Sequence, residues 1–298
     1  MPPSPWRLPA RAWLSVFKRS FKSFLADDAM GMSAQVAFSS LLAFFPAMVF
    51  LVGLLDLLGA YEALAEFLAP IAPGDVLATI ETLQKDTSKG TSVVAFFVGA
   101  AGAVWAASGA MNAVIKAVNR AYDRVETRPF WKTRAIAIVL VVLMGLVLAG
   151  LLLLIVFGGP LGTAIAEKAR LGGAFELVWT VVRWPIAFVA ILLFFSLVYY
   201  LAPNVDVRNW KWLTPGALVG SILWLVLSGL FALYTSFSDS YSKTYGALAS
   251  GIVLLLWLNY SAFALLFGAE LNSELDEQAE VHAAGGEDAG LIKPSRRS

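Results

Sequence analysis

The chain has 298 residues, of which 59% are hydrophobic and only 14% are charged, and its formal net charge is +1. Soluble domains carry about a quarter charged residues, so this deficit, spread over long apolar runs, indicates that lipid surrounds most of the chain. The sequence has no cysteine and one histidine, which excludes disulfides, thiolate metal sites, cysteine nucleophiles and histidine-rich metal sites.

The N-terminal segment, residues 1–28, contains a predicted amphipathic helix. Trp13, Phe17, Phe21 and Phe24 share one helical face, and basic residues occupy much of the rest. These basic residues are Arg11, Lys18, Arg19 and Lys22. The pattern is typical of a helix in the cytoplasmic headgroup layer. The helix either anchors the first span under the positive-inside rule or recognises anionic phospholipids.

Six later stretches are long and apolar enough to cross a bilayer, which takes about 20 residues each. In chain order they are 33–58, 92–115, 135–157, 178–201, 214–236 and 245–271. None shows the period-two alternation of a membrane β-strand, so each is predicted to be a helix. The predicted fold is therefore all-α, a polytopic membrane protein with a six-helix transmembrane domain over residues 29–275.

The remaining segments are predicted to lie outside the membrane. Short periplasmic helices are expected at 60–68, 76–83 and 163–170, and residues 276–298 read as a disordered tail. Lys and Arg are concentrated before the first span and in the loop 116–134 after the second. The positive-inside rule therefore predicts that both termini lie in the cytoplasm.

Polar and aromatic side chains recur inside the predicted spans. Tryptophan normally prefers the membrane interfaces, and its indole N–H needs a partner when it is buried. Such groups could line a polar cavity, or they could hydrogen-bond between helices as packing contacts worth about 0.6–2 kcal/mol each. The residues predicted for a substrate pathway are Gln35, Ser39, Pro46, Trp105, Ser108, Asn112, Trp224, Trp257 and Asn259.

Three motifs in order resemble the YihY/BrkB family of bacterial inner-membrane proteins over about residues 10–275. The first is AQVAFSSLLAFFPAMVFLV, with Ala37, Phe38, Ser39 and Pro46. The second is an Asn-x-x-Tyr-x-x-x-Glu-x-Arg run formed by Asn119, Tyr122, Glu126 and Arg128. The third runs from LAPN at 201–204 to LLLWLNYSAFALLFGAELNSEL, with Trp257, Gly268, Ala269, Glu270 and Asn272. The resemblance implies a six-helix membrane protein without an established activity; members have been labelled as ribonuclease BN, as virulence factors and as transporters.

The loop after the second span carries a predicted structural or gating lock. Asn119, Tyr122 and Glu126 share a helical face, and Arg128 follows just beyond. We expect this cluster to tie the loop to the end of the sixth span, near Glu270 and Asn272.

The sequence favours no enzyme class. It has no Walker A motif, no Gly-rich dinucleotide turn, no G-x-S-x-G elbow and no paired carboxylates within a span. We therefore expect no catalytic residue, cofactor, metal or nucleic-acid partner, and leave oligomerisation open. The leading hypothesis is a transporter or permeation pathway for a small solute or a lipid-like envelope component. A membrane scaffold or lipid-organising protein is the alternative, and a ribonuclease is a third.

Overall fold

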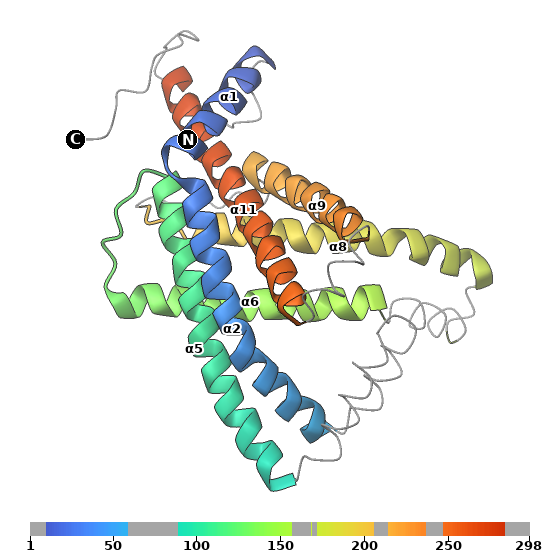
Figure 1. Ribbon diagram of the computed structural model, residues 1–298. Helices are drawn as coiled ribbons and strands as arrows, with labels where there is room; N and C mark the ends of the chain where they lie inside the picture. The colour runs from blue at the N-terminus through green and yellow to red at the C-terminus, as the bar shows by residue number, and fades with distance from the viewer. Residues whose placement is uncertain are drawn as a thin grey trace. The chain divides into compact units, whose positions relative to one another are not determined.

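The computed structural model describes residues 10–58, 89–156, 168, 172–205, 214–236 and 247–283. Within these ranges it has seven helices and no strand (Figure 1). Six of the helices are long and apolar enough to cross a membrane, which confirms the predicted fold class.

The helix boundaries agree with the predicted spans at most ends. The helices are α1 (Ala10–Ala26), α2 (Ala29–Leu58), α5 (Lys89–Ala121), α6 (Phe130–Val156), α8 (Gly172–Leu201), α9 (Pro215–Ser236) and α11 (Ala247–Ala283). One expectation was wrong: residues 276–283, assigned to a disordered tail, continue α11, because their acidic and alanine residues extend a helix readily. The short periplasmic helices at 60–68 and 76–83, almost all of 163–170, and the tail 284–298 lie outside the described residues.

The chain divides into two compact units, which we describe separately. Unit 2 covers residues 38–110 and unit 1 the rest. In unit 2, Gly99 of α5 lies directly against the backbone of Phe50 in α2, and Gly102 faces the Pro46 ring. Small residues at these positions let the two helices approach closely.

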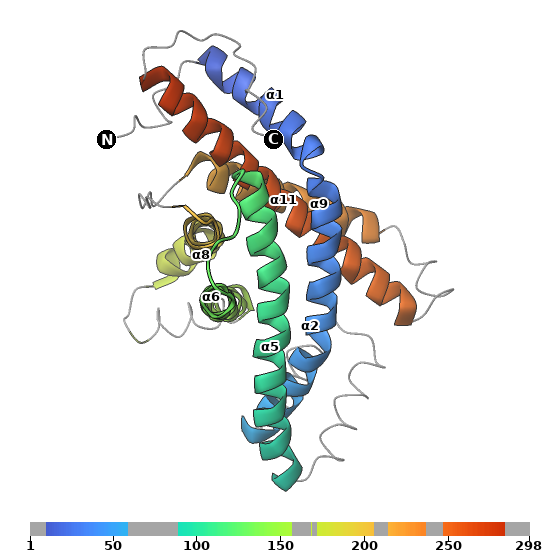
Figure 2. The same cartoon turned by 90° about the vertical axis from the view of Figure 1, so that its left-hand side faces the viewer.

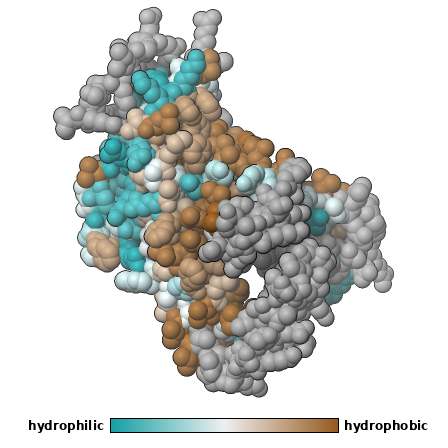
Figure 3. Space-filling model, in the orientation of Figure 1, coloured by the Kyte–Doolittle hydropathy of each residue, from teal (hydrophilic) through white to brown (hydrophobic). Residues whose placement is uncertain are grey.

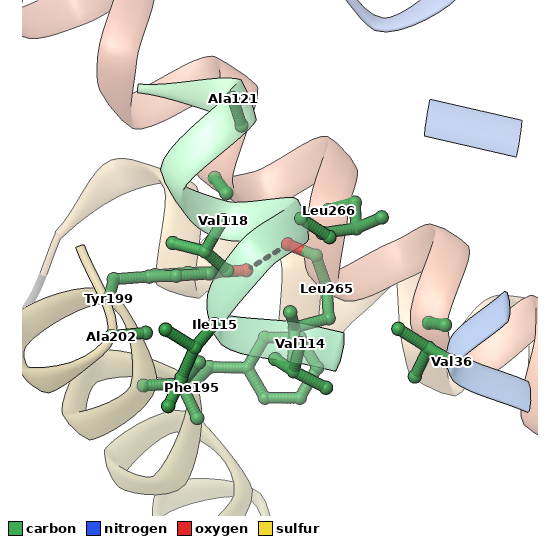
Figure 4. Close-up of a cluster of buried hydrophobic side chains, with 14 of the residues drawn as sticks. Val36, Val114, Ile115, Val118, Ala121, Phe195, Tyr199, Ala202, Leu265 and Leu266 are labelled. Atoms are coloured by element: carbon green, nitrogen blue, oxygen red, sulfur yellow. Dashed lines mark hydrogen bonds between the residues drawn. The ribbon is translucent and has the colours of Figure 1, made fainter. Parts of the chain in front are cut away.

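Unit 1 has one apolar core to which all seven described helices contribute. Phe24, Val36, Ile115, Leu140, Val198, Ala217 and Leu266 are representative members. Figure 4 shows part of this core, where the α5 side chains lie between those of α8 and α11. The buried residues cluster where α5 and α8 end and where α6 and α9 begin. We call this the capped end of unit 1.

The opposite halves of four unit 1 helices carry exposed apolar side chains, although the described part of the α11 half is mostly half-buried. We call residues 141–156, 172–190, 222–236 and 247–261 the open halves of α6, α8, α9 and α11. Large apolar side chains such as Leu146, Val181 and Leu230 are exposed there. A Cβ added to Gly145, Gly150, Gly229 or Gly251 would meet no atom within 4 Å. Figure 2 shows α6 and α8 end-on beside each other, while α9 and α11 run in another direction. Among the described residues nothing covers these exposed side chains, so they are available for contact with lipid.

Many of the hydrophilic residues gather in two places. Figure 3 shows them gathered over α1 and over the loop between α5 and α6, whereas brown, hydrophobic residues cover the visible face of α2. This is the distribution expected where helices leave a bilayer and enter its aqueous boundary.

Helices α9 and α11 pack antiparallel in a constant register. Gly216 lies against Gly268 and Gly220 against Ala264. Further along, Trp224 contacts Ser261, and Ser228 contacts Trp257. Glycines at the capped end bring the two backbones together, and the tryptophan–serine pairs continue the interface towards the open halves.

This register predicts how two glycines of the same helix differ in their tolerance of alanine. A Cβ on Gly216 would collide with the carbonyl oxygen of Gly268 and the amide of Asn272. We expect Gly216→Ala to destabilise the protein by about 1–3 kcal/mol, as overpacking of a tight interface does. Gly229→Ala, where no atom lies nearby, should be neutral or slightly stabilising. Thermal unfolding in detergent measures both variants; equal losses would show that the helices are not in this register.

Candidate functional site

The loop after α5 begins with a defined helix end. The Arg124 N–H donates to the Asn119 carbonyl, the Asp123 N–H donates to the Arg120 carbonyl, and Asp123 has φ 51°. This is a Schellman ending with an aspartate at the left-handed position. It reverses the chain, so that Val125–Arg128 run back beside the last turn of α5.

Arg128 caps the C-terminus of α8. Its side chain forms a bidentate ion pair with Glu126, with Nε–Oε1 2.7 Å and Nη2–Oε2 2.6 Å. The same guanidinium donates to the carbonyls of Leu201 and Ala202 at 3.4 and 2.7 Å. Terminal helix carbonyls lack partners within their own helix, and a cation there also suits the helix dipole. The loop is thereby fastened to the end of α8.

Asn119 and Asn204 complete this connection. The Asn119 amide donates to Glu126 at 2.8 Å and accepts from the Asn204 N–H at 2.7 Å. The Asn204 side chain in turn donates to the Val125 carbonyl and to the Thr127 hydroxyl, both at 2.8 Å. Each of these donors finds an acceptor, so the cluster can hold the loop in one conformation.

The charge of Glu126 is favoured by its partners. The hydrogen bond from Arg128 lowers the pKa of the Glu126 carboxyl below its usual 4.5, against the opposing effect of desolvation. A carboxyl with a lowered pKa in the folded state stabilises the fold above its unfolded pKa. The ion pair is thus fully formed at neutral pH, and its contribution is lost as the pH falls through the lowered pKa.

Asn272 of α11 caps the N-terminus of α9. Thr214 is the N-cap residue: its hydroxyl accepts from the Ala217 N–H at 3.1 Å, and Pro215 occupies the first helical position. Asn272 accepts from the Gly216 N–H at 2.8 Å and donates to the Thr214 hydroxyl at 3.0 Å. This side chain therefore satisfies a backbone N–H that has no partner in its own helix.

Tyr122 lies between the two capping groups. Its phenol interacts with the Asn272 side chain, and Asp276 and Glu270 are close enough to affect its charge. Burial, reinforced by these carboxylates, raises the pKa of Tyr122 far above its usual value. The phenol is neutral at any physiological pH and is available as a hydrogen-bond donor.

These contacts divide the predicted lock into two groups. Asn119, Glu126 and Arg128 bind the end of α8, whereas Asn272 binds the start of α9. We expected the loop to reach the end of the sixth span. The ion pair of Glu126 and Arg128 reaches the end of the fourth span at Ala202, because the Schellman turn points the loop there. Tyr122, at the start of the loop, faces Asn272 of α11. Glu270 is buried close to Tyr122.

A tyrosine not singled out in the sequence joins α8 to the α9–α11 interface. The Tyr199 hydroxyl donates to the Leu265 carbonyl at 2.6 Å and lies against Gly268 and Gly220 (Figure 4). A buried phenol needs a hydrogen-bond acceptor. This need is general to tyrosine, and the sequence holds no further signal that Tyr199 makes this contact between helices.

The mid-depth tryptophans of unit 1 link α9 to α11. The Trp224 N–H donates to the Ser261 hydroxyl at 3.0 Å, and the Trp257 N–H donates to the Ser228 hydroxyl at 3.3 Å. The two rings meet edge to face with centroids 6.1 Å apart. Both N–H groups are used in helix packing, which was the alternative left open for them.

Asn259 differs from these tryptophans. It lies two residues from both Trp257 and Ser261, which face α9, so its side chain is on the opposite side of α11. It is half-buried, and within the part of the chain described here its amide makes no hydrogen bond.

The other predicted pathway residues are spread over the two units. Gln35 is exposed on α2 and Asn112 half-buried on α5, both in unit 1. Ser39 and Pro46 are half-buried in unit 2, where Trp105 is 65% exposed. Ser108 is buried there, and its hydroxyl donates to the Trp105 carbonyl at 2.8 Å. Among the described residues, Trp224 and Trp257 meet between two helices of unit 1, and Ser108 meets Trp105 within α5 of unit 2.

Comparisons with known proteins identify relatives of this chain. A family model described as "Virulence factor BrkB" matches residues 20–291. YfkH of Bacillus subtilis (strain 168), whose name calls it ribonuclease-like, is 30% identical over 276 residues, 90% of this chain and 98% of that protein. A UPF0761 membrane protein of Pseudoalteromonas atlantica is 28% identical over 286 residues, 91% of this chain and 90% of that protein. No solved structure matches the chain.

The capping role of Arg128 predicts unequal effects for two arginines of the same loop. The Arg128 side chain is 6% exposed and holds both Glu126 and the α8 carbonyls, so Arg128→Ala leaves charged and polar groups without partners. We expect a loss of about 2–4 kcal/mol of stability. Arg124 is exposed, and Arg124→Ala should change stability by under about 0.5 kcal/mol. Thermal unfolding of the purified variants tests this; similar values for both would refute the cap.

Proposed function

The chain belongs to the BrkB family of membrane proteins, and we propose that it provides a path across the bacterial inner membrane for a lipid-like amphiphile of the envelope. The observation that carries the proposal is the half-buried amide of Asn259, without a protein hydrogen bond in the described residues, beside the open half of α11.

An amide at this depth is costly without a partner. Asn259 lies in the span Gly251–Gln278, with apolar neighbours on either side along the helix. Transfer of an unpaired amide into an apolar medium costs about 2–7 kcal/mol, depending on the reference state. Polar groups kept inside membranes usually serve a pathway. A polar headgroup or water that enters beside α11 would supply the hydrogen bonds that the described residues do not give to this amide.

The open halves favour an occupant with acyl chains over a small polar solute. Exposed Val181, Leu225 and Leu230 present only hydrocarbon, which suits an acyl chain better than a hydrated solute. In a bilayer the space between diverging helices is filled by lipid, since lipid tails are as apolar as leucine. An amphiphile could keep its tail among these side chains while its headgroup meets Asn259.

The tryptophans have a structural role in this proposal. Trp224 and Trp257 are held by serines of the facing helix, so they keep α9 and α11 together on the side of α11 opposite to Asn259. The capping residues Arg128 and Asn272 keep the helix ends fixed while an occupant moves between the open halves.

Two other functions remain as alternatives. A scaffold or lipid-organising protein would use the same exposed surfaces without moving an amphiphile across the membrane. A ribonuclease corresponds to the name of YfkH; purified protein that leaves RNA intact would remove it. The transport assay below separates the first alternative from the proposal.

Lipid movement should depend on the Asn259 amide. Vesicles that contain the purified protein and an NBD-labelled phosphatidylglycerol should exchange the probe between leaflets, measured by dithionite quenching, faster than protein-free vesicles. Asn259→Leu should lower the rate about tenfold, the equivalent of ~1.4 kcal/mol, because the headgroup loses its hydrogen bonds. Asn259→Gln should keep most of the rate, and Ile252→Val, an exposed position of the same helix, should keep all of it.

Two results would contradict the proposal. Wild-type protein that moves the probe no faster than empty vesicles would favour a scaffold. A folded Asn259→Leu protein with the wild-type rate would show that this amide is not on the path.

The orientation is part of the proposal and has its own test. The basic loop containing Arg124 should face the cytoplasm, because loops rich in Lys and Arg are retained there. The chain has no cysteine, so a single Arg124→Cys can be labelled alone. We expect a membrane-impermeant maleimide to reach it in inverted membrane vesicles and not in intact cells; the reverse pattern would invert the topology.

A further inference from the structure

Helix α1 has two adjoining apolar faces, and among the described residues only one of them is buried against the rest of the protein. Val16 and Phe24 are fully buried. The Phe24 ring meets Phe263 and Phe267 of α11 with centroids 4.6 and 5.9 Å apart, and Val16 packs with Leu271 and Leu275. This face fixes α1 along the end of α11.

The second face is a stripe of exposed apolar side chains. We call it the α1 stripe: Leu14, Phe17, Phe21 and Leu25, each about half exposed or more. Spacings of three, four and four residues place all four side chains within about a quarter of the helix circumference. Phe17 marks its boundary with the docked face, since its ring also contacts Phe267 at 5.3 Å. Four large exposed apolar groups in line mark an interaction surface.

Two lysines border the stripe on its other side. At 100° per residue, Lys18 and Lys22 follow directly beside Leu14 and Leu25 around the helix, and both are exposed. Arg19 lies further round and is engaged with Glu274 of α11, Nε–Oε2 3.7 Å, where Ser23 also donates to the carboxylate at 2.9 Å. Of the described cations of α1, only Lys18 and Lys22 therefore face outward next to the stripe.

The stripe lies at the level where the first span begins. Only Asp27 and Asp28 separate α1 from α2, and Asp28, with φ 55°, makes the tight turn. Asp27 is buried and faces Arg120 at the end of α5, Nε–Oδ1 3.5 Å, which fixes the turn. Leu25 is thus within a few residues of the membrane-crossing helix and close to the boundary of the bilayer.

From this geometry we propose that α1 binds the surface of an anionic phospholipid leaflet. The α1 stripe inserts among the upper acyl chains, and Lys18 and Lys22 contact the lipid phosphates. The sequence pattern alone named Arg11, Lys18, Arg19 and Lys22; the structure commits Arg19 to Glu274, and the Arg11 side chain lies outside the described residues. Apolar burial plus lysines at the edge is the combination that gives interfacial helices their preference for anionic lipid.

Contact between the stripe and acyl chains is tested by site-specific quenching. The full-length Phe21→Cys protein, labelled with bimane in lipid nanodiscs, should be strongly quenched by lipids with brominated acyl chains. Ser15→Cys is the matched control on the same helix, because position 15 lies beyond the lysines on the side away from the stripe. We expect little quenching there. Thermal unfolding confirms that both labelled proteins are folded.

The headgroup preference is tested with the same label. Brominated phosphatidylglycerol should quench bimane at position 21 more than brominated phosphatidylcholine at equal mole fraction. Lys18→Gln with Lys22→Gln should remove this difference, because each lysine near an anionic surface contributes about fivefold in relative affinity, ~1 kcal/mol. Lys132→Gln, which removes an exposed lysine of α6, should leave it intact, and high salt should weaken it.

Three outcomes would overturn the proposal. Absence of quenching at position 21 by either lipid would show that the stripe is not in the bilayer. Equal quenching by the two lipids in the otherwise unchanged protein would refute the anionic contact. Disulfide-linked dimers of the unlabelled Phe21→Cys protein at high yield in nanodiscs would show that the occupant is a second copy of the chain.

Discussion

Two side chains that cap the helices of distant segments determine how unit 1 is held together. Arg128, from the loop after α5, donates to the carbonyls of Leu201 and Ala202 at the end of α8. Asn272, from α11, accepts from the Gly216 N–H at the start of α9. Helix ends carry backbone groups without intrahelical partners, and near a membrane boundary water cannot be relied on to satisfy them. Because α8 ends and α9 begins at fixed points, the Gly216–Gly268 crossing and the Tyr199 contact follow.

The two helix caps connect the capped end of unit 1 to the proposed path. The glycine crossing sets the register in which Trp224 and Trp257 meet serines of the facing helix, and that register turns Asn259 away from α9. Tight packing at the capped end and exposed apolar halves beyond it leave space that lipid or a lipid-like molecule can fill. Helix α1, docked on the far end of α11 through Phe24 and Glu274, adds a second lipid-facing surface.

The sequence was sufficient for local features and insufficient for long-range ones. Apolar run lengths predicted all six long helices, and the placement of aromatic and basic residues predicted α1. The Asn119–Glu126–Arg128 cluster was also predicted, because its members are close in sequence. The attachment of this cluster to Ala202 was not predicted. It depends on the left-handed backbone conformation of Asp123, which aspartate adopts only in some contexts. The hydrogen bond between Tyr199 and Leu265 joins residues 66 positions apart, and such a contact produces no periodic pattern in the sequence.

The central claim is that the α6–α8 pair and the α9–α11 pair of unit 1 converge at the capped end and diverge towards the open halves. The most direct test is a pair of spin–spin distances in lipid nanodiscs, measured between labels on α8 and α11 in the cysteine-free chain. Labels at Leu201 and Ser273 report the capped end, and labels at Val182 and Ile252 report the open halves. The account predicts that the second distance exceeds the first by at least one helix diameter, about 10 Å. Equal distances, as for helices packed along their whole length at about 8–10 Å between axes, would contradict it.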